Sequence, residues 1–406
     1  MRRQRALRRV LLAAGAVLSA FALAPLGAAN GPPPGNLPNS PATPDNLSGE
    51  QWSLAQIRAF DAHTTTGGSP LVRVALIDTG IDPGHPEFAG RIDTANSVSC
   101  ATGLPVRDPS GMLWRDGTGH GTLVAGLVAA GDNGFGIVGV APHVQLLIVK
   151  VANPGQPITP AATACAFDYV ATQNIDVANA SFAVDKGATG GADPHDFFCR
   201  DVKADKQAIK LVTDAVRKAR KSGTTVVASA GNNDLDMAHP PLGNECIRMP
   251  VELPGVIGVS GNGRLGQRTM ATPPGPSNYG VGVIDVVAPG GDPAQGGVPA
   301  GLILSTFPSY IPVPPTSPNI VDGPPGATYR YTAGTSFAAA HASGVAALIV
   351  SRFGDLGTPE NGKLRPGKVR AFLQATAEDL GEPGYDQFFG HGEVDALGAV
   401  LHEPAP

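Results

Sequence analysis

The feature of this sequence that most limits its fold is a repeated alternation between short apolar runs and longer helical runs. The short runs are apolar throughout, which is typical of strands that are covered on both faces. We predict such strands at 71–77, 144–151, 175–182, 225–230, 256–260 and 283–288. Helices are predicted around them, at 51–63, 119–130, 160–173, 201–222, 336–350 and 368–377. This order predicts an α/β fold with one mostly parallel, doubly wound sheet flanked by helices.

The glycine and proline content indicates many loops around this core. Gly (53) and Pro (39) together make 92 of the 406 residues, about twice the share that ordinary turns need. Two stretches rich in these residues, 183–199 and 290–327, interrupt the alternation. We expect both to be surface loops that approach a functional site, and the second, with Tyr310 near its middle, to contribute to substrate contacts.

Residues 1–29 have the pattern of a secretory signal peptide. Five arginines among the first nine residues precede an apolar stretch at 10–26, and small residues at 27–29 suit cleavage after Ala29. Removing this segment takes away five positive charges and no negative ones, so the formal net charge moves from −5 to −10. Such an acidic protein is a poor partner for nucleic acid. Because no second apolar run is long enough to cross a bilayer, we expect a secreted protein with no stable membrane anchor.

Four cysteines in a chain expected to be exported predict two disulfide bonds. Their spacing lacks the paired CxxC pattern of a zinc site. Three pairings exist, and we favour Cys100 with Cys165 and Cys199 with Cys246, because these bonds join neighbours in the sequence.

A turn of small residues presents Ser336 at the start of an Ala-rich, apolar helix. The run from 331 to 344 reads Tyr-Thr-Ala-Gly-Thr-Ser-Phe-Ala-Ala-Ala-His-Ala-Ser-Gly. The unpaired N–H groups and the positive dipole end of a helix N-terminus can hold negative charge that develops on a substrate oxygen. Taken alone, the turn fits a simple cap before a core helix equally well.

Three other polar residues follow strands or begin a helix. Asp78 ends the first predicted strand and Asn232 follows a later one, at the edge where open parallel sheets bind their ligands. His120 lies between two glycines at a helix start, where the dipole disfavours a charged imidazole and so suits a general base. An asparagine can donate to an oxyanion without carrying charge. Each residue also has a purely structural explanation as a strand-end, helix or turn cap.

Three segments together resemble the subtilisin-like serine peptidases (subtilases). They are Ile-Asp-Thr-Gly-Ile at 77–81, Gly-His-Gly-Thr-Leu-Val-Ala-Gly at 119–126 and Gly-Thr-Ser-Phe-Ala-Ala at 334–339, in that family's order of Asp, His and Ser. Shorter similarities extend from about 51 to 401. The resemblance implies a subtilisin-like peptidase domain at 51–402, which follows the signal peptide and an extended, Pro/Gly-rich segment at 30–50.

The resemblance also implies the activity and its residues. Asp78, His120 and Ser336 would form a catalytic triad, and Asn232 would hold the oxyanion together with the N–H of Ser336. The chain would then be a secreted serine endopeptidase that cleaves protein or peptide substrates through an acyl-enzyme and needs no cofactor for chemistry. Sequences typical of esterases (Gly-x-Ser-x-Gly) and of dinucleotide-binding proteins (Gly-x-Gly-x-x-Gly) are missing at the positions that would carry them.

Substrate contacts are implied in the same way. Ser181, Phe182 and Ala183 resemble the strand that pairs with the peptide, and Ala230 and Gly231 a wall of the pocket for the residue before the scissile bond. Ala183 stands where the family usually has glycine, and its methyl group narrows the groove. A catalytically impaired, peptide-binding member of the same fold is therefore the alternative function. Ala340 replaces a proline usually found before the helix histidine, and His341 is expected to be structural.

A structural calcium ion is the one metal that the resemblance suggests. The run Asp-Asn-Gly-Phe-Gly-Ile-Val-Gly at 132–139 resembles the family's calcium loop, and Glu87 lies where a carboxylate ligand would fall. Calcium takes six to eight oxygen ligands, and the sequence names only Glu87 and Asn133. A tight loop without metal is the alternative.

Overall fold

The structure is a computed structural model that describes residues 45–186, 196–270, 275–313, 317–357 and 363–402. The predicted signal peptide and most of the 30–50 segment lie outside these residues. The described end of that segment begins at Asp45 and contains the short 3₁₀ helix η1 (Ser48–Glu50).

Eight strands form the central sheet in the order β10-β9-β7-β5-β1-β4-β2-β3. Every neighbouring pair is parallel except β2–β3. In chain order the strands are β1 (Arg73–Asp78), β2 (Val98–Ser99), β3 (Val106–Arg107), β4 (Gln145–Lys150), β5 (Val177–Ala180), β7 (Thr225–Ser229), β9 (Ile257–Asn262) and β10 (Val286–Pro289). The predicted mostly parallel sheet is confirmed. β2 and β3 were not predicted, because two residues are too few to show a pattern.

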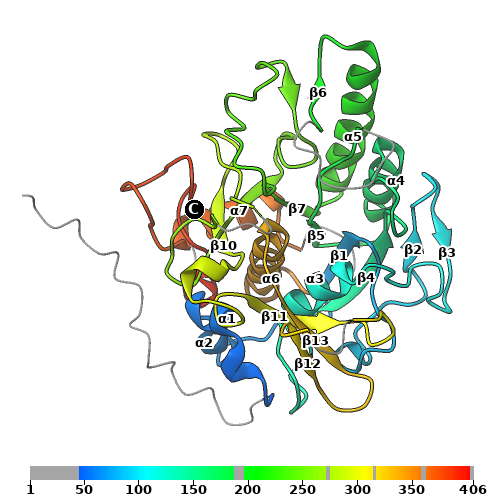
Figure 1. Cartoon of the computed structure of the whole chain (residues 1–406). Coiled ribbons are helices and arrows are strands. Elements are labelled where there is room, and N and C mark those ends of the chain that lie inside the picture. The colour runs from blue at the N-terminus through cyan, green and yellow to red at the C-terminus, as the bar shows by residue number, and fades with distance from the viewer. Residues whose placement is uncertain (1–44, 187–195, 271–274, 314–316, 358–362, 403–406) are drawn as a thin grey trace, which may run out of the picture. The chain divides into compact units, whose positions relative to one another are not determined.

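Helices pack on both faces of this sheet (Figure 1). One core contains α3 (His120–Ala129), α6 (Thr335–Phe353), α7 (Pro366–Thr376) and α8 (Ala396–Leu401), and the other contains α4 (Pro160–Val170) and α5 (Lys203–Lys221). Strand β1 shows the division, since Val74 and Leu76 enter the first core while Ala75 and Ile77 enter the second. Side chains of successive strand residues point to opposite faces, so a sheet covered on both sides needs apolar residues at both positions.

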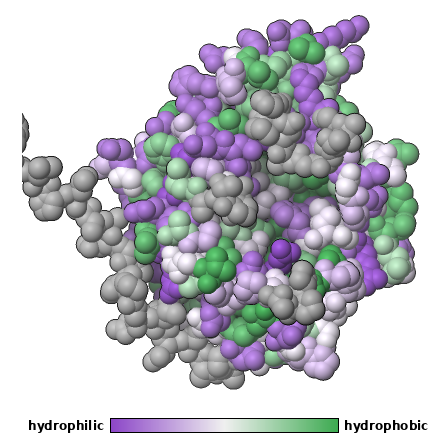
Figure 2. Space-filling model, viewed as in Figure 1, coloured by the Kyte–Doolittle hydropathy of each residue, from purple (hydrophilic) through white to green (hydrophobic). Residues whose placement is uncertain are grey.

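The long helices differ in how much of their surface is buried. In α5 the buried side chains Val212, Ala215, Val216 and Ala219 recur at the spacing of one helical face. The opposite face is charged, and the α5 region at the top of Figure 2 is mostly hydrophilic. Helix α6 is buried nearly all round. It is the one helix of the described residues long and apolar enough to cross a membrane, but 78% of that window is buried inside the protein, as in a core helix.

The 290–327 stretch is not the surface loop that its composition suggested. It contains β11 (Ile303–Phe307), every residue of which is buried, and β12 (Ile320–Asp322). Both pair with β13 (Thr328–Thr332) in an antiparallel three-stranded sheet in the order β11-β13-β12. Ser305 and Thr306 of β11 donate hydrogen bonds to carbonyl oxygens of α3, so this small sheet packs directly against the helix that begins at His120.

Two further predictions about the backbone need correction. The predicted helix at 51–63 is two helices, α1 (Trp52–Gln56) and α2 (Ala59–His63), because Arg58 between them adopts a left-handed conformation with φ 55°. The 183–199 stretch, of which 187–195 lie outside the described residues, ends in β6 (Phe198–Cys199), which pairs with β8 (Cys246–Ile247).

The structure joins Cys100 to Cys165 and Cys199 to Cys246, which confirms the favoured pairing. The first bond links the end of β2 to α4, and the second links the paired strands β6 and β8. Closing loops of 65 and 47 residues restricts the unfolded chain, which stabilises the folded state by about 4 kcal/mol for each bond in the chain-entropy account.

Candidate active site

The parallel strands bring three of the four predicted catalytic residues to one edge of the sheet. Asp78 is the last residue of β1, and Asn232 follows β7 by three residues. In the register of the sheet, Ile77 lies beside Ala180 at the end of β5, and Ala180 lies beside Ala228 of β7. The carboxyl ends of these strands therefore meet, and His120, the first residue of α3, lies over them.

Asp78 and His120 form the predicted pair. The Asp78 carboxylate is buried, and its Oδ1 lies 2.7 Å from His120 Nδ1 and accepts a hydrogen bond from the Thr79 N–H. Burial of the imidazole lowers the pKa of His120, but the charge and hydrogen bond of Asp78 and the charge of Asp116 raise it, and the pKa ends above its ordinary value. The helix N-terminus was expected to keep this imidazole neutral. The raised pKa runs against that expectation, because the two carboxylates outweigh the effect of burial.

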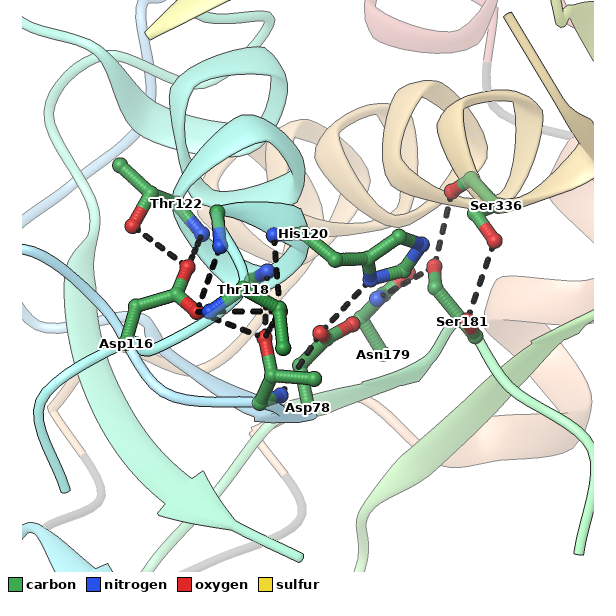
Figure 3. Close-up of polar contacts among 11 residues, drawn as sticks. Asp78, Asp116, Thr118, His120, Thr122, Asn179, Ser181 and Ser336 are labelled. Atoms are coloured by element: carbon green, nitrogen blue, oxygen red, sulfur yellow. Dashed lines mark hydrogen bonds and ion pairs between the residues drawn. The ribbon is translucent and has the colours of Figure 1, made fainter. Parts of the chain in front are cut away.

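Asp116 organises the His120 loop, a role that the sequence did not reveal. Its buried carboxylate accepts hydrogen bonds from the backbone N–H groups of Thr118, Gly119 and Thr122 and from the hydroxyls of Thr79 and Thr122 (Figure 3). These donors include the otherwise unpaired N–H groups around the first turn of α3. An acid four residues before the helix histidine was the available signal, since acidic residues commonly cap helix starts.

Ser336 lies in the first turn of α6 and faces the same site. Figure 3 shows the His120 ring between Asp78 and Ser336. In this structure Ser336 Oγ donates a 3.0 Å hydrogen bond to the carbonyl of Ser181 instead of pointing to the imidazole. Ser181 Oγ in turn donates to the Ser336 carbonyl at 2.8 Å. The segment that follows β5 therefore fixes the backbone of the serine.

Ser181 itself is held by a buried chain of polar side chains. Asn179 of β5 donates to Ser181 Oγ at 2.9 Å and accepts from the Ser343 hydroxyl of α6, also at 2.9 Å. All three side chains are buried, so these hydrogen bonds join β5 to α6 in a region that water does not reach. Asn179 and Ser343 therefore position Ser336 indirectly, through Ser181. No pattern in the sequence singles them out; they stand out in the structure because their polar side chains are buried.

Asn232 is oriented with its amide nitrogen free for a ligand. Its Oδ1 accepts the Thr335 N–H at 2.9 Å, and none of the described residues accepts a hydrogen bond from its Nδ2 or from the Ser336 N–H. A side chain at Gly334 would approach Asn232 Nδ2 to 3.6 Å, which places this amide beside the Ser336 turn. Two unused donors therefore lie next to the serine.

The turn that carries Asn232 is fixed by a residue that the sequence did not single out. The buried side chain of Asn278 donates to the carbonyl of Ala230 and accepts the N–H groups of Asn233 and Leu235. Its own N–H donates to the Gly231 carbonyl. Gly231 has φ +100°, and a Cβ there would approach Asn278 Nδ2 to 2.7 Å, so both the conformation and the contact require glycine.

The predicted substrate-contact residues divide into two groups. The Ser181 side chain is buried and hydrogen-bonded to Ser336. The backbone groups of Ala230 and Gly231 are likewise occupied by hydrogen bonds to neighbouring residues. Phe182 and Ala183 are only half-buried, and none of the described residues forms a hydrogen bond with their backbone groups. These two residues therefore present the free N–H and C=O groups that an extended peptide could pair with.

The residues suggested for calcium do not fit a cation in this structure. Glu87 Oε1 accepts hydrogen bonds from the Tyr329 hydroxyl and the Ile137 N–H, and Oε2 accepts from the Asn133 amide at 2.8 Å. Donors thus surround the carboxylate where a cation would need oxygens. Asn133 and Gly134 also donate their backbone N–H groups to Asp45. No group of three or more His, Cys, Asp or Glu within the described ranges is arranged to hold a metal ion.

His341 has a structural place, as expected. It is buried in α6, with Nδ1 2.7 Å from the Phe337 carbonyl and Nε2 3.1 Å from the Ser53 hydroxyl. Burial lowers the pKa of His341 to about 4, so the ring is neutral at ordinary pH. It links α6 to α1 and has no contact with Ser336 or His120 among these interactions.

The mostly parallel sheet with helices on both faces matches the fold of the subtilisin-like serine proteases. The chain belongs to the Subtilase family, whose model matches residues 70–392. It is therefore a serine protease, and the family's homologues are serine endopeptidases that need no cofactor for catalysis.

Individual relatives agree with this assignment. The sequence is 29% identical to subtilisin E of Bacillus subtilis over 349 residues, which cover 86% of this chain and 71% of that protein. It is also 29% identical to fervidolysin of Fervidobacterium pennivorans over 369 residues, which cover 89% of this chain but only 45% of fervidolysin. The fold is similar to the crystal structure of a lanthipeptide protease, with a TM-score of 0.69, 26% identity and coverage of 87% of this chain and 94% of that one.

Proposed function

We propose that this protein is a secreted serine endopeptidase in which Asp78, His120 and Ser336 form the catalytic triad. The observation that carries the proposal is the 2.7 Å contact between Asp78 Oδ1 and His120 Nδ1, with the imidazole facing Ser336. With its Nδ1 hydrogen held by Asp78, the ring offers Nε2 as the base. The two disulfides and the signal-like segment at 1–29 support export.

The reaction follows from these positions. Ser336 Oγ attacks the carbonyl carbon of the scissile bond while His120 Nε2 takes its proton. The resulting oxyanion is held by Asn232 Nδ2 and the Ser336 N–H, the two donors that have no partner among the described residues. His120 then protonates the leaving amine. Water then hydrolyses the acyl-enzyme. His120 takes a proton from the attacking water and afterwards returns a proton to Ser336 Oγ, which leaves as the free hydroxyl.

The proposed substrate is an extended protein or peptide chain. Phe182 and Ala183 would pair with the residues before the scissile bond, because their backbone groups are free and they follow β5 at the site. Ala230 and Gly231 would form one wall of the pocket for the residue directly before the bond. The Ala183 methyl group, at a position where the family usually has glycine, would favour small neighbouring side chains in the substrate.

A fluorophosphonate probe, which labels an activated serine, tests the triad. The full-length protein should be labelled, Ser336→Ala should not, and Ser351→Ala should be labelled like the wild type, because Ser351 lies farther along α6 and donates to the Ala347 carbonyl. Labelling that persists in Ser336→Ala, or no labelling of the wild type, would refute the triad. Labelling without cleavage of any casein or peptide-library substrate would favour the impaired, peptide-binding alternative.

A further inference from the structure

An arginine points into the proposed active site from the small antiparallel sheet. Arg330 lies in the middle of β13, six residues before Ser336. Its guanidinium carbon is 5.1 Å from the centre of the Phe307 ring on the neighbouring strand β11. Phe307 in turn packs against Gly119, where a Cβ would come within 2.3 Å of the ring. A cation is attracted to an aromatic face, and this contact favours a position of the guanidinium beside the loop that carries His120.

Arg330 lines a cavity together with the catalytic residues. The cavity has a volume of about 280 Å³. It is lined by Arg330, His120 and Ser336, with Asn232 and six further residues: Thr118, Leu123, Thr332, Ala333, Gly334 and Phe337. No carboxylate is among these lining residues. The backbone of Arg330 is paired within the small sheet, but its guanidinium forms neither an ion pair nor a hydrogen bond with any of the residues that the structure describes.

On the substrate path proposed above, the cavity would lie on the leaving-group side of the scissile bond. It omits Ser181, Phe182 and Ala183, where the residues before the bond would pair. Its walls come instead from α3, β13 and the start of α6. A peptide that runs past Ser336 from Phe182 therefore enters this cavity with the residues that follow the bond.

We propose that Arg330 selects substrates with a carboxylate within the first two residues after the scissile bond. This inference rests on the proposed function. The planar guanidinium donates in pairs to a carboxylate, and a half-buried site strengthens the contact relative to open water. The protein carries a net negative charge, so an acidic preference would be a local property of this cavity and not of the whole surface.

Matched peptide pairs test the proposal. Internally quenched peptides with amidated C-termini would differ only by Glu or Gln at the first or second position after the bond. A charge-assisted hydrogen bond predicts about a tenfold or greater preference for Glu in kcat/KM at one of these positions. Arg330→Gln should abolish the preference, Arg330→Lys should retain part of it, and Arg330→Glu should reverse it.

Arg352→Gln is the matched control. Arg352 also lies over a phenylalanine ring, at 5.2 Å from Phe353, but near the far end of α6, so its removal changes the net charge equally and should leave the Glu/Gln ratio unchanged. Peptides that end two residues after the bond, with a free or an amidated terminus, distinguish a terminal carboxylate from a side chain. A preference confined to the free terminus would keep carboxylate recognition and assign it to the chain end.

Failure of this inference is distinguishable from failure of the proposed function. Fluorophosphonate labelling and a thermal midpoint measured on each variant show whether Ser336 is active and the protein folded. A wild type that is labelled and cleaves peptides, but treats Glu and Gln alike and also treats free and amidated termini alike, overturns the role of Arg330 alone. A Glu preference that survives in a folded, labelled Arg330→Gln variant overturns it as well. An unlabelled wild type overturns the triad.

Discussion

Replacing Asp116 with asparagine should weaken the fold and move the pH dependence of activity together. The carboxylate Oδ1 accepts from Thr79, Thr118 and Gly119, and an asparagine oxygen can keep these contacts. The new amide nitrogen then replaces Oδ2, which accepts the Thr122 N–H at 2.9 Å and the Thr122 hydroxyl at 2.8 Å. The hydroxyl can rotate and accept from the amide, but the Thr122 N–H meets another donor.

The magnitude follows from these contacts. A hydrogen bond to a charged group contributes about 1.5–3 kcal/mol, and a buried donor left without a partner costs about 1–3 kcal/mol. We expect Asp116→Asn to lower the free energy of unfolding by about 3 kcal/mol, measured by urea denaturation at pH 7. Because the Asp116 charge raises the pKa of His120, its loss should lower that pKa. The base must be neutral, so the acid limb of kcat/KM should shift to lower pH.

Asp82→Asn is the control for the pH effect. Asp82 is a buried carboxylate of the neighbouring loop, its N–H bonds to Thr122, and its charge is not among those that raise the pKa of His120. The acid limb of kcat/KM of the Asp82→Asn variant should lie at the same pH as that of the wild type. An Asp116→Asn variant with unchanged stability, or with its acid limb at the wild-type pH or above, would refute the reasoning.

Three further predictions concern buried groups. Because donors surround Glu87, excess EDTA should leave the thermal midpoint unchanged, and a fall that added calcium reverses would contradict this. Burial raises the pKa of Glu87 from 4.5 to about 7; its stabilising effect is therefore present below pH 4.5 and lost as the pH rises through 7, by up to about 3 kcal/mol. Glu87→Gln should flatten this pH dependence in urea titrations. A variant whose free energy of unfolding falls with pH as steeply as that of the wild type would count against the assignment. Since burial lowers the pKa of His341 to about 4, His341→Gln should keep the wild-type acid limb of activity, and a shifted limb would give His341 a catalytic part.

The elements that the sequence predicted well are those whose burial is uniform. Helix α5 shows one apolar face and α6 is buried nearly all round, and both begin and end within three residues of the predicted bounds. Strand β11 was missed because its five buried residues lie inside a Pro/Gly-rich stretch, where composition outweighed a short apolar run. Strand β13 reads Thr-Tyr-Arg-Tyr-Thr, and its two tyrosines are the buried residues. This alternation of aromatic and polar residues was a usable signal of a strand with one covered face.

The sequence could predict those parts of the site that depend on residues close together in the chain. Asp78 and His120 meet as expected, because a strand end and a glycine-flanked helix start leave little freedom. The bond from Ser336 to Ser181 and the support from Asn278 depend on contacts between residues 155 and 48 positions apart. No local pattern encodes such contacts, since they arise only when the sheet brings separate strands together.

Each proposed catalytic group is held by an element other than its own, and this explains why its sequence signal was weak. The Ser336 backbone is held by Ser181 after β5, and the Asn232 amide by the Thr335 N–H of α6. His120 is held by Asp78 at the end of β1. A residue that depends on a distant partner looks, in its own segment, like an ordinary cap or turn. The sheet makes these weak signals specific, because its parallel strands deliver all the partners to one edge, where a change in any support alters the geometry of the reacting atoms before it alters substrate binding.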